Sequence, residues 1–299
     1  MLIQPAISLL RELQLTDFPS GSALAFTDGR LYVVGDDARE MRILDAQYRA
    51  AGSVTLFKHP QYRIPKPEKA DLESAVVMKH KQALYLAAFG SASLPTRKQI
   101  ILVPLPFRNS DTSIVYTRYA DDFLDLLSQK LPEINIEGAA MAGNRLILAN
   151  RGHHGMPHNT LVIARADCWN PAGADLPHFQ QVTLPENSRG FCGVSDLCYI
   201  PSRDLLLMTF TTEATASTYD DGIIGDSYLA CIRDYSKKLR EETVTPDEMI
   251  NLPSVSPVFA GQKIEGICLE KVRPEGLLLH LVADNDAGDS RLFAINAVL

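Results

Sequence analysis

Three glutamates stand near the start of short apolar runs that have almost the same wording. They are Glu73, Glu137 and Glu265, and Ser22 and Ser195 take the same place in two further runs. In chain order the five runs are GSALAF, LESAVV, IEGAA, GVSDLCYI and IEGICL. A strand entering a core seldom needs a carboxylate at its start. Carboxylates brought together with hydroxyls would form an oxygen-rich site of the kind that holds a hard cation such as Ca²⁺.

The five runs are parts of a repeat of roughly 50 to 70 residues. In each repeat a turn follows the first run, and then comes a second apolar segment: LYVVG, LYLAAF, LILAN, LLLMTF or LLLHLVA. A polar loop leads to a third segment: MRILD, IILVPL, LVIAR, YLACI or RLFAI. Short segments rich in β-formers and bounded by turn residues are typical of strands.

This pattern predicts an all-β fold, a five-bladed β-propeller with about four antiparallel strands per blade. We expect one domain over residues 1–299, with blades starting near residues 19, 68, 132, 189 and 260. The segment 6–14 precedes the first repeat, and the last repeat has chain for three strands only. Segment 6–14 should therefore complete the last blade and close the ring, which removes two sheet edges. Two inserted helices are expected, at 119–131 and at 245–252.

In a propeller the first strand of each blade lines the central channel. Ser22, Glu73, Glu137, Ser195 and Glu265, called the ring residues below, should then face one another around the axis. Three carboxylates in a partly dry channel repel each other, and protonation or a bound cation relieves the repulsion. With no His or Cys among them, the ring residues favour Ca²⁺ as the ion. The alternative is that the glutamates sit at turns on the channel rim and face water.

The chain resembles the five-bladed calcium-activated nucleotidases, the apyrase family first known from blood-feeding insects. In that family Ser, Glu, Glu, Ser and Glu from successive blades surround a calcium ion, which is the order of the ring residues. The stretch LYVVGDDARE resembles that family's strand running into a paired-Asp loop with a nearby Arg, and RGFCGVSDLCYIPSRDLLLMTF and QKIEGICLE are similar to its fourth and last blades. The likeness covers most of the chain in order, through short motifs. Uncharacterised bacterial propellers related to phytase-like and esterase-like propellers are the alternative family.

The resemblance implies a calcium-dependent hydrolase acting on nucleotides or other phosphate esters. Asp36 or Asp37 would orient or deprotonate the attacking water, and Arg39 with Arg151 would bind the phosphate. The stretch NRG around Arg151 departs from the two consecutive arginines usual in that family. A non-catalytic propeller that binds a ligand or a protein around a structural ion is therefore the competing hypothesis.

The second strand of each blade runs back toward the ring, so the loops that follow it should surround the same mouth of the channel. These loops carry further polar residues that could bind a small phosphate-bearing or sugar-like ligand: His153, His154, Glu213, Asp284 and Asp286. His154 and His158 stand four apart in HHGMPH, but Gly155 and Pro157 are incompatible with the helix of an HExxH zinc site. A surface loop is the preferred interpretation.

Composition excludes several classes of function. The net charge of -7 and the pI near 5.5 are unsuited to binding nucleic acid. No apolar stretch is long enough for a membrane span. The N-terminus lacks the basic region of a signal peptide, and the five cysteines form no CxxC pair. We expect a cytoplasmic protein with reduced thiols, and the sequence gives no indication of its oligomeric state.

Overall fold

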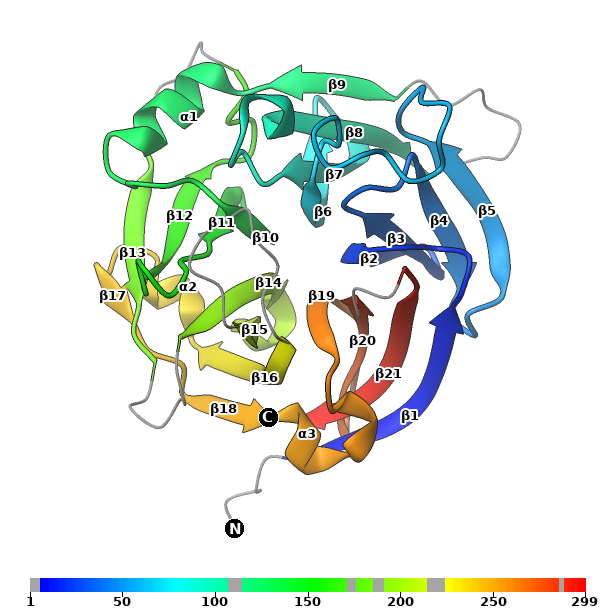
Figure 1. The fold of residues 1–299 in the computed structure, drawn as a ribbon. Coiled ribbons are helices and arrows are strands. Elements are labelled where there is room, and N and C mark those ends of the chain that lie inside the picture. The colour runs from blue at the N-terminus through cyan, green and yellow to red at the C-terminus, as the bar shows by residue number, and fades with distance from the viewer. Residues whose placement is uncertain (1–5, 107–114, 171–175, 185–190, 214–223, 285–287) are drawn as a thin grey trace.

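The structure, a computed structural model, describes residues 6–106, 115–170, 176–184, 191–213, 224–284 and 288–299. Five β-sheets stand around a central axis, and the sheets are built from antiparallel strands (Figure 1). In blades 1 to 4 the strand nearest the axis comes first along the chain, whereas in blade 5 the N-terminal strand β1 is the outermost and β19 is nearest the axis. The all-β, five-bladed propeller predicted from the repeat is confirmed.

The first two blades run from the axis outward in simple chain order. Blade 1 consists of β2 (Gly21–Thr27), β3 (Arg30–Gly35), β4 (Glu40–Asp45) and β5 (Ala50–Thr55). Blade 2 consists of β6 (Leu72–His80), β7 (Ala83–Gly90), β8 (Gln99–Leu105) and β9 (Tyr116–Tyr119).

The connection between the last two strands of blade 4 adds a short fifth strand to the outer edge of blade 3. Blade 3 consists of β10 (Ile136–Ala142), β11 (Arg145–Asn150), β12 (Asn159–Arg165) and β13 (His178–Val182), with the two-residue β17 (Thr243–Val244) added parallel to β13. Blade 4 consists of β14 (Cys192–Ile200), β15 (Leu205–Glu213), β16 (Ile224–Arg233) and β18 (Glu248–Asn251).

The last blade contains both ends of the described chain. It consists of β19 (Lys263–Arg273), β20 (Gly276–Asp284), β21 (Ser290–Val298) and the N-terminal β1 (Ala6–Leu15). β1 lies antiparallel along β21, where Figure 1 shows the two ends of the colour scale side by side. The N-terminal strand therefore closes the ring as predicted, and β21 is not left as an edge.

The hydrophobic core is divided into five clusters, and each lies between two neighbouring blades. Between blades 1 and 2, for example, Tyr32 and Met41 pack with Leu72 and Leu86, all four fully buried. Alternate residues of a strand face opposite sides of its sheet, so every blade supplies apolar side chains to two clusters. The blades therefore stabilise one another around the whole ring.

One of the two predicted helices is present. α1 (Asp121–Ser128) falls within the expected segment 119–131 and buries Phe123, Leu124 and Leu127. The helix expected at 245–252 is wrong, because residues 248–251 form β18 and pair with Tyr228–Cys231 of β16. Without that partner β16 would be an exposed edge, and pairing prevails over local helix preference.

The remaining helices are single turns at the ends of strands. They are η1 (Pro95–Arg97), η2 (Pro201–Arg203), α2 (Tyr235–Lys238), α3 (Leu252–Val255) and η3 (Pro257–Phe259). Among the described residues, no helix combines the length and the apolar character needed to cross a membrane.

Candidate functional site

Every innermost strand contains a β-bulge, and the bulge falls at the same position in all five blades. In blade 3, for instance, the pairing of β10 with β11 shifts between Ile136 and Gly138. The extra residues at these shifts are the ring residues Ser22, Glu73, Glu137, Ser195 and Glu265. A bulge bends its strand and turns the side chain of the extra residue out of the regular alternation. The repeated bulge is thus the local device that orients the ring residues.

The three ring glutamates meet. One carboxylate oxygen each from Glu73, Glu137 and Glu265 lies within 4.8 Å of the other two. Glu137 and Glu265 are only 9% and 4% exposed. Neighbouring innermost strands are in contact all around the ring, which brings residues of blades 2, 3 and 5 this close. We call these three residues the central triad.

The two ring serines make contacts between blades. The Ser22 hydroxyl donates to the carbonyl of Leu72, and the Ser195 hydroxyl donates to that of Ile264 at 2.7 Å. Leu72 and Ile264 directly precede Glu73 and Glu265. Each serine therefore holds the backbone next to a ring glutamate of the following blade.

A second acidic group adjoins the central triad through a shared residue. Oxygens of Asp36, Asp71 and Glu73 also lie within 4.8 Å of one another. The ammonium group of Lys69 forms ion pairs with Asp36 and, at 2.7 Å, with Asp71. We call Asp36, Asp71 and Glu73 the lateral triad.

Basic and amide groups surround both triads. Arg97 is buried and pairs with Asp71 at 2.7 Å, while the Arg151 guanidinium lies 3.8 Å from Glu137 and donates to Thr211. The Lys263 ammonium lies 2.9 Å from Glu265. The Asn135 amide donates to Glu137 at 2.7 Å, so the carboxylates are held in fixed positions.

The Glu73 carboxylate is the one that lies in both triads. Burial, then the charges of Asp71 and Glu137, raise the pKa of Glu73 well above its usual value. Burial likewise raises the pKa of Glu137 to about 7, against the opposing charge of Arg151. In both residues the charged form lacks enough stabilisation from this environment, and a cation between them would supply it.

A cavity of about 310 Å³ opens beside the lateral triad. Its walls include Asp36, Asp37, Arg63, Lys66, Lys69 and Asp284. Asp37 is held by Arg63 at 2.7 Å, and burial raises the pKa of Asp36 to about 6. The Asp36 Oδ1 atom is buried without a hydrogen-bond partner. This carboxylate therefore combines a free basic oxygen with a pKa near neutrality.

Other sequence-predicted site residues lie further from the triads. Arg39 stacks over Tyr62 at 5.9 Å and donates to the His59 carbonyl, so its guanidinium faces the β5–β6 connection. His153 pairs with Glu133 at 3.1 Å, and His154 is exposed.

The side chains of two predicted rim residues lie outside the part of the chain that the structure describes. Glu213 ends β15, but its side chain lies outside the described part of the structure, and Asp286 falls outside the described residues.

Sequence reasoning missed most of the charged partners of the ring. Asp71, Asn135 and Lys263 each stand two residues before a ring glutamate, and alternate strand residues share a face. This spacing is a signal that could have found them. Lys69 comes from a connection, where no periodic pattern identifies it.

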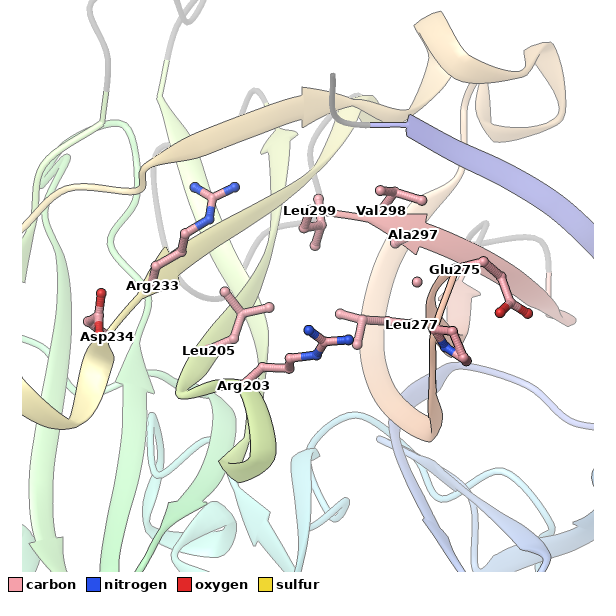
Figure 2. Close-up of a pocket in the computed structure, with 11 residues that line it drawn as sticks. Arg203, Leu205, Arg233, Asp234, Glu275, Leu277, Ala297, Val298 and Leu299 are labelled. Carbon is pink, nitrogen blue, oxygen red and sulfur yellow. The ribbon is translucent and has the colours of Figure 1, made fainter. Parts of the chain in front are cut away.

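A larger cavity, of about 480 Å³, lies between blades 4 and 5 (Figure 2). In Figure 2 the side chain of Arg203 extends between Leu205 and Leu277, and Arg233 stands opposite Leu205 on the neighbouring strand β16. Its walls come from η2, the β19–β20 turn and the ends of β16 and β21. These segments lie at the opposite ends of β14 and β19 from the ring residues, so this cavity is separate from the triads.

Residues 17–296 match the model of a family of unknown function, DUF6929. The chain belongs to the DUF6929 family. No curated protein matches it. The fold is similar to the crystal structure of Myxococcus xanthus glutaminyl cyclase, at 11% identity and a TM-score of 0.52 over 99% of this chain and 98% of that one. It is also similar to an exo-1,5-alpha-L-arabinanase from a bovine ruminal metagenomic library, at 12% identity and a TM-score of 0.50 over 93% and 92%.

At this low identity the two likenesses concern the fold alone. Both are named as enzymes, so the architecture of this DUF6929 protein is one on which enzymes are built. The nucleotidase-like activity remains a prediction.

Proposed function

We propose that this DUF6929 protein binds a divalent cation, Ca²⁺, in the central triad. The observation that carries the proposal is the mutual approach of Glu73, Glu137 and Glu265 within 4.8 Å, in an environment whose burial and negative charges raise the pKa of Glu73. Three carboxylates offer six oxygens and no nitrogen or sulfur, a set that suits Ca²⁺, which takes six to eight oxygens.

The balance of charge supports an anionic ligand above such an ion. The described residues of the two triads carry five carboxylates, and four basic side chains pair with them: Lys69, Arg97, Arg151 and Lys263. With all of them ionised, a divalent cation would give the group a net positive charge. A negatively charged ligand would restore neutrality.

We further propose that the ligand is a nucleotide or another small phosphate ester and that the protein hydrolyses it. Bound at the central triad, Ca²⁺ would supply Lewis-acid chemistry to phosphate oxygens. The Asp36 Oδ1 atom accepts the proton of the attacking water, for which a pKa of about 6 is suitable near neutral pH. Arg151 is the buried cation beside Glu137 and stabilises charge on the phosphate.

Cation binding is tested by melting wild type and Glu137→Gln with Ca²⁺ and with chelator. Glutamine keeps the hydrogen bond to Asn135 but loses the negative charge, so the loss is one of ion affinity more than of packing. Wild type should melt higher in Ca²⁺ than in chelator, and the variant should lose most of that difference. A wild type that melts identically in both conditions contradicts the proposal.

Activity is tested by phosphate release from nucleoside di- and triphosphates and simple phosphate esters. We expect turnover that requires Ca²⁺ and falls by about 100-fold or more in Asp36→Asn. Asp28→Asn, in the exposed β2–β3 turn, is the matched control and should behave as wild type. Absence of turnover across the panel, with Ca²⁺ bound, rejects the hydrolase.

A second candidate function is a non-catalytic propeller whose central ion is structural. The orientation of Arg39 toward Tyr62 favours it, because this leaves Arg151 as the only one of the two predicted phosphate-binding arginines at the triads. Ca²⁺ binding that raises the melting temperature without any turnover would establish this alternative.

A further inference from the structure

The lateral triad has the geometry of a second cation site. Asp36, Asp71 and Glu73 approach one another as closely as the three residues of the central triad do, and Glu73 belongs to both. Two cations that share a bridging carboxylate are the arrangement of two-metal hydrolases, in which the metals lie about 3.5–4 Å apart. The three negative charges of the lateral triad therefore need a positive charge to balance them.

The ammonium of Lys69 lies within the lateral triad. It pairs with Asp36 and with Asp71, and the charge of Glu73 also acts on it. Lys69 is 8% exposed, so solvent contributes little to balancing these carboxylates. Asp71 is itself fixed from its other side by Arg97 and by the hydroxyl of Ser91 at 2.6 Å.

Lys263 provides a comparison, because its side chain is more exposed than that of Lys69. Its ammonium lies 2.9 Å from Glu265, its charge also acts on Glu137, and its side chain is 20% exposed. The Lys69 side chain is 11% exposed and pairs with two members of its triad. The lateral triad thus holds a cation of the chain that pairs with two of its members and is less exposed than the lysine beside the central triad.

We propose that Lys69 is the resident second cation of the centre, which binds one metal ion and uses this ammonium where two-metal hydrolases use a second ion. The proposal rests on the cation site of the proposed function. It also defines the ligand as an oxyanion that contacts both the ion and Lys69. The cavity of about 310 Å³ provides the space, since Lys69, Lys66 and Arg63 all line it.

The number of bound ions tests this proposal without any assay of activity. Calorimetric titration of the full chain with Ca²⁺ should give one ion per chain for wild type. Removing the ammonium takes its positive charge away from the three carboxylates, of which Asp71 keeps its pair with Arg97, so Lys69→Met and Lys69→Gln should bind two. Lys69→Arg keeps the positive charge and should bind one, as should the matched control Lys58→Met in the exposed β5–β6 connection.

Inorganic phosphate serves as the oxyanion probe. It should bind the Ca²⁺-loaded wild type and Lys69→Arg, and bind at least about ten times more weakly to Lys69→Gln at Ca²⁺ concentrations that fill one site only. Equal phosphate affinity in all three proteins overturns the assignment of the ligand.

The outcomes separate the two proposals. A wild type that binds no cation refutes the proposed function. A wild type that binds two ions, or folded neutral variants that bind one, overturns the role of Lys69 and leaves the central site intact. If the neutral variants unfold in chelator, added Ca²⁺ should restore their structure, and failure to do so also overturns the role of Lys69.

Discussion

Glu73 and Glu137 hold their protons more tightly in the folded protein than in the unfolded chain when no cation lies between them. Burial is the largest cause, and neighbouring carboxylates add to it, so the pKa of Glu137 rises from 4.5 to about 7 and that of Glu73 rises as well. Between these pH values the folded state binds more protons than the unfolded state. Its free energy of unfolding must then fall as pH rises. We predict that the melting temperature in chelator decreases from pH 5 to pH 8.

The controls for this pH dependence use Ca²⁺ and a variant that cannot ionise. Saturating Ca²⁺ replaces the protons and should reduce the decrease. Glu137→Gln should lose part of the slope in chelator, because one of the responsible groups is gone. A melting temperature in chelator that rises between pH 5 and pH 8 would contradict the assigned pKa shifts.

The ring glutamates could be identified from the sequence, whereas most of the side chains that pair with them could not. Glu73, Glu137 and Glu265 recur at one position of a repeat, and repetition singles them out. Lys69 does not recur in the repeats, because it comes from the long β5–β6 connection. Its position between Asp36 and Asp71 is evident only in the folded structure.

The β-bulges explain why the strand pattern in the sequence could locate the ring residues but could not predict the orientation of their side chains. A regular alternation would place Glu137 on one side of the sheet, against a neighbouring blade. The shift between Ile136 and Gly138 removes it from that alternation. A single extra residue has no signature in composition or spacing, and it becomes visible only when the strand has a partner to pair with.

Blades 5 and 1 are joined by a chain of buried hydrogen bonds, for which we make a prediction. The hydroxyl oxygen of Tyr48, in the β4–β5 turn, lies 2.8 Å from His280 Nδ1. On the other side of the ring, His280 Nε2 lies 2.9 Å from Glu270 Oε2. Burial lowers the pKa of His280 to about 4, so the neutral ring donates to Glu270 and accepts from Tyr48. Tyr48→Phe leaves a buried nitrogen without its donor and should lower the free energy of unfolding by about 1–3 kcal/mol.

Urea denaturation at pH 7 measures this loss. Tyr119→Phe is the matched control, because Tyr119 is 56% exposed, and it should change the free energy of unfolding by less than about 0.5 kcal/mol. Equal effects of the two substitutions would show that the Tyr48 hydroxyl contributes nothing to the contact between the blades.

The architecture of the whole molecule was the most predictable part of the protein. Five similar repeats, one strand without a partner at the N-terminus and a last repeat one strand short leave ring closure as the consistent solution. The error at 245–252 did not disturb this result, because β18 only completes blade 4. The activity was not predictable in the same way, since it depends on which charged side chains from different blades meet at the triads.

Ring closure by β1 makes the stability of every blade depend on the N-terminal strand, and this gives the last prediction. β1 pairs with β21 from Ala6 to Leu15, buries Leu15 and packs Ile7, Leu9 and Leu13 partly into the clusters beside it. A chain starting at Thr16 should lose at least about 3 kcal/mol of unfolding free energy, at roughly 1 kcal/mol for each such side chain. It should also self-associate, because β21 becomes an unpaired edge. A chain starting at Ala6 keeps β1 and is the control, with denaturation and light scattering as the measurements. If the two chains match in both, the strand does not close the ring in solution.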